Sequence, residues 1–393
     1  MAMALARGTD ERFEDALAVI VAGAGPGTLA APYATSRGPA AAKRRRIVEN
    51  AEGLHDLVRA SLRYLRSRSA AFAPAPPSAG ILDARSALGA AVAAAVGADR
   101  RSDGSDGAAA AERGAAYDLG DVADRLLVAV DETRFSVGGR ACVARAASAT
   151  LLGDCSRWAR PLLRRGRTYD VIVADPPWPS RSAARRGLYA TGGRDWRGPL
   201  RRFPARRLAA PTGALVGVWA TNDAKVERFV REDLFKKWGV AFVGRWYWLK
   251  VADGLVPAVP IDEAAERKPW EVLVVGVLAG AAGAAEPVLG GAEPLGATAS
   301  RLDAGDAARR ARWRRPGAGA GELDAVPETL VFAGPPGSHS AKPRLDALFR
   351  ACFAGGGAEP PAGLELFGRA SFEGWTAAGD QALPLAPPGV GDG

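Results

Sequence analysis

The sequence predicts an α/β fold built around a mainly parallel β-sheet. Three apolar runs, centred on Val171, Leu215 and Val272, have the length of buried strands, and stretches with helical spacing lie between them. The chain has 393 residues, of which 48% are hydrophobic, so it can bury the core of one large domain with extensions. We expect this domain to be Rossmann-like.

The domain is expected to span residues 118–385, with an Ala/Gly-rich insertion at about 279–325. Residues 1–117 are expected to form an accessory region, partly helical and partly of low complexity, and residues 386–393 a flexible tail. In the accessory region, apolar residues at helical spacing predict an amphipathic helix that packs on the domain; they are Leu54, Leu57, Val58, Leu62 and Leu65. The basic run at 43–46 is compatible with nuclear import or phosphate binding, and equally with solvated charge.

The most informative segment runs from Tyr169 to Trp178 and reads Tyr-Asp-Val-Ile-Val-Ala-Asp-Pro-Pro-Trp. Its β-branched run does not alternate and is too short for a helix, so it predicts a strand buried on both faces of a parallel sheet. Pro176 and Pro177 end the strand, because proline offers no amide donor and holds the preceding residue extended. Asp175 and Trp178 should then lie beyond the carboxyl end of the strand, where open α/β sheets bind ligands. An ordinary strand exit, with Asp175 capping a helix, is the alternative.

These residue types suit methyl transfer to an exocyclic amino group. The lone pair of such a nitrogen is delocalised into the base, so the nitrogen is a poor nucleophile until acceptors grip its hydrogens. The carboxylate of Asp175 and the carbonyl of Pro176 are candidate acceptors, held still by the two prolines, Pro176 and Pro177. Trp178 offers an apolar face for a base taken out of its stack. A carboxylate here also stabilises the charge of a sulfonium methyl donor.

The motif Asp175-Pro176-Pro177-Trp178 resembles the signature of the mRNA N6-adenosine methyltransferase (MT-A) family, and the flanking sequence is most similar to its methyltransferase-like protein 4 branch. The similarity runs in order from about residue 148 to 381, and its other blocks are residues 151–156, 208–211, 218–222, 245–250, 268–276, 338–343 and 364–369. Several blocks in the right order are far stronger evidence than one short motif. The resemblance implies a Rossmann-like methyltransferase with the permuted order, in which the catalytic loop precedes the strand that holds the donor.

The resemblance also implies S-adenosylmethionine as the cofactor and a set of residues that hold it. The implied contacts are Asp154 and Cys155 at its adenine, Asp175 at its methionine amino group, Lys342 at its carboxylate, and Arg369 and Gln381 at its ribose. No metal is expected to take part.

The charge of the chain predicts an anionic partner. The net charge is +9 and the isoelectric point is near 9.8. Residues 157–207 hold 14 arginines against three aspartates, an excess of +11 around the predicted catalytic loop. Arginine suits phosphate oxygens and stacks on bases, so we expect contacts to a nucleic acid from Arg181, Arg185, Arg186, Tyr189, Arg194 and Asn222. A compositional bias towards arginine, with side chains that only solvate a helix face, is the alternative.

The remaining composition excludes several classes of protein. Three scattered cysteines and two histidines cannot build a zinc site of the usual spacing or a disulfide framework. We therefore expect a reducing compartment inside the cell, the nucleus and in addition the cytoplasm. No apolar run approaches the ~20 residues of a membrane span.

The motif, the family resemblance and the charge together predict an N6-adenine methyltransferase acting on RNA, for which the resembled branch implies small nuclear RNA. DNA as the substrate, or an inactive nucleic-acid-binding subunit, are the alternatives, and the choice between a monomer and a partner subunit stays open.

Overall fold

A computed structural model gives the fold of the chain. It describes residues 5–7, 16–20, 54–68, 109–110, 114–178, 196–211, 213–252, 255–261, 268–278, 326, 328–336, 342–343, 345, 348–349, 361–369 and 372–383. The strands are β1 (Leu5–Arg7), β2 (Ala16–Ile20), β3 (Ala109–Ala110), β4 (Ala116–Tyr117), β5 (Leu126–Ala129), β6 (Thr133–Val137), β7 (Arg140–Ala144), β8 (Ser148–Leu152), β9 (Val171–Ala174), β10 (Ala214–Ala220), β11 (Val240–Ala252), β12 (Val256–Pro257), β13 (Trp270–Leu278), β14 (Thr329–Gly334), β15 (Gly363–Leu366) and β16 (Trp375–Gly379). The helices are α1 (Leu54–Arg68), α3 (Leu119–Val122), α4 (Ala159–Arg164), α6 (Arg197–Arg201), α7 (Ala205–Leu208), α8 (Ala224–Phe229), the π-helical turn η3 (Val230–Leu234) and α9 (Phe235–Trp238).

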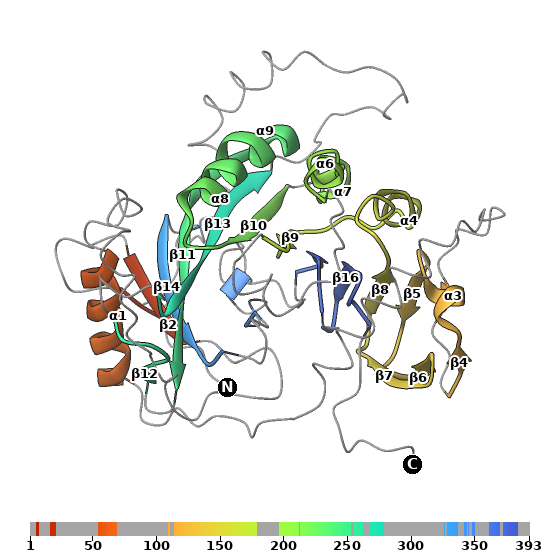
Figure 1. Ribbon diagram of the computed structural model, residues 1–393, viewed down its shortest axis with the longest axis horizontal. Helices are drawn as coiled ribbons and strands as arrows, with labels where there is room; N and C mark the ends of the chain where they lie inside the picture. The colour runs from red at the N-terminus through yellow and green to blue at the C-terminus, as the bar shows by residue number, and fades with distance from the viewer. Residues whose placement is uncertain are drawn as a thin grey trace, which may run out of the picture.

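Most strands belong to one large mixed sheet (Figure 1). Its order is β1-β2-β14-β11-β13-β10-β9-β15-β16-β8-β5-β3, with β12 paired to β11. The centre, from β10 through β9, β15 and β16 to β8, is parallel, as expected. The expectation of a mainly parallel sheet is wrong at β13, which runs antiparallel to both β10 and β11. The apolar run of β13 reads the same in either direction, so the sequence pattern alone did not reveal its orientation.

Strand β9 confirms the prediction made from its β-branched run. All four residues are buried, and the strand pairs in parallel with β10 on one side and β15 on the other. The chain leaves the sheet at Asp175, whose N–H still donates to the carbonyl of Leu366 at 3.1 Å. Pro176 and Pro177 follow without pairing to a strand, as their missing amide donors require.

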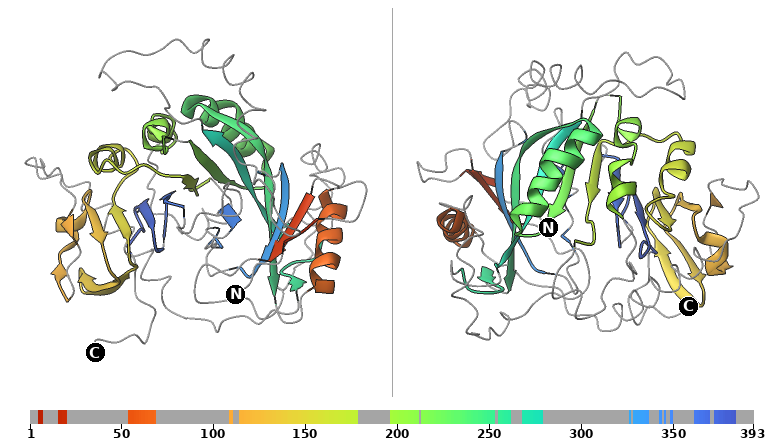
Figure 2. Two further views of the ribbon diagram at one scale, coloured as in Figure 1. Left: turned by 180° about the vertical axis from the view of Figure 1, so that it is seen from behind. Right: turned by 45° about the horizontal axis from the view of Figure 1, so that its top comes forward.

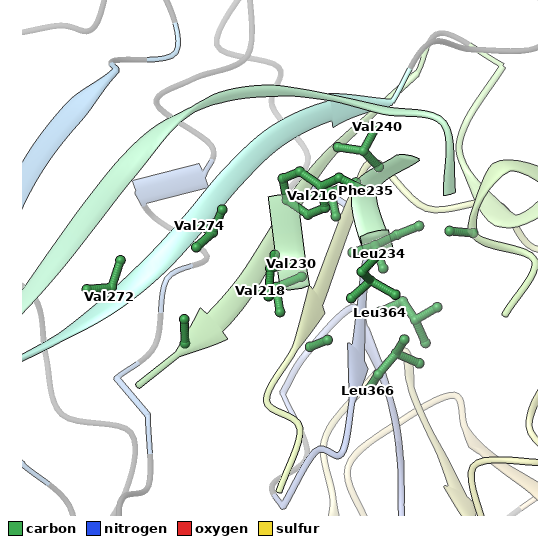
Figure 3. Close-up of a cluster of buried hydrophobic side chains, with 14 of the residues drawn as sticks. Val216, Val218, Val230, Leu234, Phe235, Val240, Val272, Val274, Leu364 and Leu366 are labelled. Carbon is green, nitrogen blue, oxygen red and sulfur yellow. The ribbon is translucent and has the colours of Figure 1, made fainter. Parts of the chain in front are cut away.

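The sheet is packed on both faces. Helices α4, α6, α7, α8 and α9 lie along one face (Figure 1). Figure 3 shows this side of the core, where Val216 and Val218 of β10 meet Val230, Leu234 and Phe235. The opposite face forms a second core that includes Val171, Val173, Trp219, Trp246 and Trp248. The odd-numbered residues of β9 therefore point into the second core, and Asp175 continues their row.

Helix α1 confirms the predicted amphipathic helix. Leu57, Val58, Leu62 and Leu65 are buried in the core, and the helix packs against β2 and β14 at one end of the large sheet. A small sheet of β4, β6 and β7 lies at the other end (Figure 2). Strands β1 and β2 extend the large sheet beyond β14, so the accessory region shares a sheet with the domain. The predicted insertion and the predicted tail lie outside the described residues. Within the described ranges, no helix is long and apolar enough to cross a membrane.

Candidate active site

The predicted site residues gather at one edge of the large sheet. Strands β8, β9, β10, β15 and β16 are parallel neighbours, so their carboxyl ends meet at the same edge. One to three residues beyond these ends stand Asp154, Asp175, Asn222, Arg369 and Gln381, in the order of the strands along the chain. From β9 the chain continues to β10 on one side, whereas its other neighbour, β15, leads on to β16 in the opposite direction. Such a switch point is where doubly wound sheets bind ligands.

The loop after β9 is held rigidly. The N–H of Trp178 donates to the carbonyl of Pro176 at 2.8 Å, which uses one of the two acceptor positions of that oxygen. The indole Nε1 of Trp178 donates to the carbonyl of Trp219 at 2.6 Å. Together with the proline rings, these bonds fix the direction in which Asp175 leaves the sheet.

The position of Trp178 corrects one expectation from the sequence. Its side chain is 5% exposed, and its ring makes edge contacts with Trp196, at 5.1 Å between centroids, and with Phe229, at 5.9 Å. An indole this deeply buried exposes little of its surface for a base to lie on. In this structure Trp178 shapes the loop, whereas the sequence pattern could not distinguish a buried indole from a presented one.

Asp175 belongs to a chain of four partly buried charges. The Nζ of Lys342 lies 3.2 Å from Oδ2 of Asp175 and 3.0 Å from Oε2 of Glu271. Lys250 donates to the other carboxylate oxygen of Glu271. We call these four residues, Asp175, Lys342, Glu271 and Lys250, the charge cluster; its two acids and two bases balance.

The charge cluster rests on an aromatic floor. The Nζ of Lys342 lies 5.4 Å from the ring centroid of Trp219, and the Nζ of Lys250 lies 5.0 Å from that of Trp248. Both indoles belong to the second core, so the floor is part of the rigid sheet. A cation above an indole face is attracted by the ring quadrupole, and the attraction is larger where water is excluded.

The protein keeps Glu271 and Lys342 ionised. Burial would raise the pKa of Glu271, but Lys342 and Lys250 lower it to about 2. Burial would lower the pKa of Lys342, but Asp175 and Glu271 together raise it above the usual range of a lysine. The stabilisation from Glu271 is therefore present above about pH 4.3 and is lost as the pH falls towards 2. That from Lys342 is present below about pH 10.4 and is lost at higher pH.

Two members of the cluster, Glu271 and Lys250, were not predicted as site residues. Both stand in blocks that carried the family resemblance, at 268–276 and 245–250. The signal that marks them is a charged residue within a strand that is otherwise buried, since an isolated buried charge is costly and must be paired.

The other residues that we predict at the donor lie beyond the carboxyl ends of β8, β15 and β16. Oδ1 of Asp154 accepts from the N–H of Ser156 at 2.9 Å and from its hydroxyl at 2.6 Å, which closes a tight turn. Cys155 is half-buried, with its Sγ 4.0 Å from the carbonyl of Trp196. Gln381 is buried and Arg369 is partly buried. Their roles at the donor stay predictions.

The backbones of the β15 and β16 ends approach closely at this edge. The N–H of Gly368 donates to the carbonyl of Ala378 at 3.1 Å. A Cβ on Gly379 would stand 2.7 Å from the carbonyl oxygen of Gly368, so only glycine fits there. Phe367, the residue before Gly368, has a φ of 62°, in the left-handed region that residues with a side chain rarely adopt. This turn leads to Arg369, and backbone strain of this kind is common at ligand sites.

The predicted substrate-binding residues are only partly placed. Asn222 is exposed, and its Nδ2 donates to the carbonyl of Trp270 at 2.9 Å, so its amide is oriented by the first residue of β13. The other five lie outside the described residues; they are Arg181, Arg185, Arg186, Tyr189 and Arg194.

The residues present fit the amino-acid end of S-adenosylmethionine. Asp175 and Lys342 hold a carboxylate and an ammonium group side by side, and the methionine part of the donor carries the complementary ammonium and carboxylate. The donor would replace one ion pair between two side chains by two ion pairs with itself. Within the described ranges, no cluster of histidine, cysteine or acidic side chains has the make-up of a metal site.

Part of the chain is similar to proteins of a known family. Residues 169–288 match the model of the MT-A70 family. The MT-A70 match begins at Tyr169, the first residue of the motif segment, and it contains Asp175, Asn222, Lys250 and Glu271. The resemblance to the MT-A family seen in the sequence is thereby confirmed.

Among three relatives of the chain, one is named as an RNA methyltransferase and one as a DNA methyltransferase. The chain is 32% identical over 241 residues to the N6-methyladenosine RNA methyltransferase MTA1 of Pyricularia oryzae, covering 59% of this chain and 52% of that protein. It is 38% identical over 129 residues to the N(6)-adenine-specific methyltransferase METTL4 of Mus musculus, covering 33% and 26%. It is 30% identical over 111 residues to the DNA N6-methyl methyltransferase of Caenorhabditis elegans, covering 27% and 28%. The matches thus span about half or less of the length of these relatives.

Proposed function

We propose that the chain is an S-adenosylmethionine-dependent N6-adenine methyltransferase that acts on RNA adenosine. The observation that carries the proposal is Asp175, which lies at the switch point of the sheet and is ion-paired to the partly buried Lys342. The names of the relatives support the reaction class, and the MTA1 match, which covers the larger share of this chain, favours RNA over DNA.

The chemistry follows from the placement of the acceptors. When bound, S-adenosylmethionine supplies a methyl group on a positively charged sulfur, which leaves as a neutral thioether. Asp175 accepts one hydrogen of the target amino group, and the carbonyl of Pro176 has a second lone pair for the other. Two fixed acceptors favour a pyramidal nitrogen whose lone pair points at the methyl group. After the transfer, the nitrogen loses a proton. This proton passes to solvent or to the carboxylate of Asp175, which already accepts a hydrogen bond from the amino group.

The loop is preorganised for this task. The hydrogen bonds of Trp178 and Asp175 hold it before substrate arrives, and preorganised electrostatic contacts are usually the largest contribution to catalysis. Before the donor binds, Lys342 keeps a positive charge 3.2 Å from Oδ2 of Asp175.

A methyl-transfer assay tests the proposal. The purified chain is incubated with labelled S-adenosylmethionine and matched RNA and DNA oligonucleotides that carry one adenine each. Label on RNA at the N6 position of adenine is the expected result. Transfer to DNA alone would move the assignment to the DNA enzymes. Binding of oligonucleotide without transfer to either would favour the inactive nucleic-acid-binding subunit.

A basic surface on the helix-covered face of the sheet supports a nucleic-acid substrate. Residues 157–169 and 196–211 hold ten arginines and no acidic residue. These segments include α4 and α7, which touch each other on the helix-covered face of the sheet, and α6. Arg202, Arg206 and Arg207 are exposed, so their guanidinium groups are accessible to phosphate. We call these three the helix arginines.

Salt dependence of binding separates a nucleic-acid role for the arginines from a structural one. If the predicted loop residues contact phosphates, the affinity for a single-stranded oligonucleotide should fall with salt, with a log-log slope of roughly 0.7 per contacted phosphate. Changing Arg181, Arg185, Arg186 and Arg194 together to alanine should flatten this slope. Changing the three helix arginines to alanine is the matched comparison on described residues. Donor affinity should not change in either variant, because the donor contacts are expected at other residues. An equal loss of donor affinity would assign the loop to the cofactor.

A further inference from the structure

The buried histidine His55 connects the accessory helix to the catalytic edge. It stands in the first turn of α1, where its side chain is 4% exposed. Its ring meets the indole of Trp270 edge to face, with 5.1 Å between centroids and an interplanar angle of 77°. Its Nε2 lies 3.3 Å from the Nζ of Lys268. One imidazole therefore contacts both residues that flank Pro269, directly before Glu271 of the charge cluster.

The chemistry of this contact fixes the state of the ring. A lysine ammonium group has hydrogens to donate and no lone pair, so Nε2 of His55 must be the acceptor. In this arrangement the imidazole takes the tautomer that carries its proton on Nδ1. An apolar side chain would fill the same space against Trp270, but it could not accept from Lys268.

The residues that His55 holds lead directly into the site. Trp270 offers its carbonyl to the amide of Asn222 at 2.9 Å, and the next residue, Glu271, bonds to Lys342 and Lys250. The start of β13 therefore orients both the predicted substrate contact and the charge cluster.

The helix itself is anchored to the same region. Arg59 donates to the carbonyl of Ile261 at 2.9 Å, and Arg66 donates to that of Leu255 at 3.0 Å. Both acceptors lie between β11 and β13, so α1 is bonded along the connection that delivers β13 to the edge. A helix fixed at these points can hold His55 against Trp270.

We propose that His55 is a positioning residue: through Lys268 and Trp270, it holds the start of β13 so that Asn222 and Glu271 keep their places at the catalytic edge. The proposal rests on the proposed function for the reaction that is positioned. It assigns the accessory helix a part in that reaction beyond covering the sheet.

Kinetics of variants at His55 test the proposal. His55→Ala should lower kcat by about 10-fold to 100-fold, the range that small misplacements of reacting groups produce, while the dissociation constant of S-adenosylmethionine stays unchanged. His55→Gln should recover part of kcat, because its amide oxygen can accept from Lys268. Arg63→Ala is the matched control, since Arg63 is exposed on the same helix. Should His55→Ala fail to fold, Lys268→Met breaks the same bond from the other side and should lower kcat likewise.

Amide hydrogen exchange gives a readout that does not need activity. Exchange of the amides at 270–273 should be faster in His55→Ala than in Arg63→Ala. A folded His55→Ala with the kcat and the exchange of Arg63→Ala, even at a lower melting temperature, would overturn the proposal. If the wild-type chain transfers no methyl group, the proposed function fails, and the exchange data alone decide whether His55 holds β13.

Discussion

Replacing Asp175 with asparagine is expected to lower kcat for methyl transfer at least about 100-fold, because it removes the charge of a preorganised acceptor. Asparagine keeps the volume and one acceptor oxygen of the aspartate, so the loop after β9 should keep its course. The measurement is the rate of label transfer at saturating oligonucleotide and donor, with circular dichroism as the check of folding.

Asparagine is the sharper substitution because of the charge cluster. Oδ2 of Asp175 lies 3.2 Å from the Nζ of the partly buried Lys342, so alanine would combine loss of the acceptor with a void beside Lys342. Asp131→Asn is the matched control, since Asp131 is exposed after β5, in the part of the sheet remote from β9. Turnover of Asp175→Asn within a few-fold of wild type would show that the loop after β9 is not the catalytic loop.

The sequence was most informative where one physical requirement fixed one structure. The run from Val171 to Ala174 has no polar face, so it had to be buried on both sides, and the two prolines had to end it. The position of Asp175 at the carboxyl edge follows from these two facts. The amphipathic stripe of α1 was readable for the same reason, because its leucines needed a partner surface.

The sequence was least informative where a contact joins distant segments. Lys342 meets Glu271 across about 70 residues of chain, much of it outside the described residues, and no local pattern announces the pair. The orientation of β13 and the burial of Trp178 depend in the same way on neighbours from elsewhere in the chain. The resemblance to a family predicted Lys342 as a site residue, but its partner Glu271 was revealed only by the structure.

Replacing Lys342 with methionine is expected to destabilise the chain by about 3 kcal/mol, the lower end of the range for a broken buried ion pair, because it leaves two partly buried carboxylates without their shared cation. Of the charge cluster, Glu271 would keep Lys250, whereas Asp175 would lose the partner that lies 3.2 Å away. Denaturant unfolding near pH 7 measures the effect, since Glu271 and Lys342 are charged there in the wild type. Methyl transfer should be lost in the same variant.

The double variant Asp175→Asn with Lys342→Met separates stability from catalysis. Removing one charge of each sign leaves Glu271 and Lys250 as a balanced pair, so much of the stability lost in Lys342→Met alone should return. Methyl transfer should not return, because the acceptor carboxylate and the lysine expected at the donor are both gone. If the double variant is as unstable as the sum of the single variants, Asp175 and Lys342 do not interact in solution. If it regains activity together with stability, the charge cluster serves the fold and the catalytic acceptor lies elsewhere.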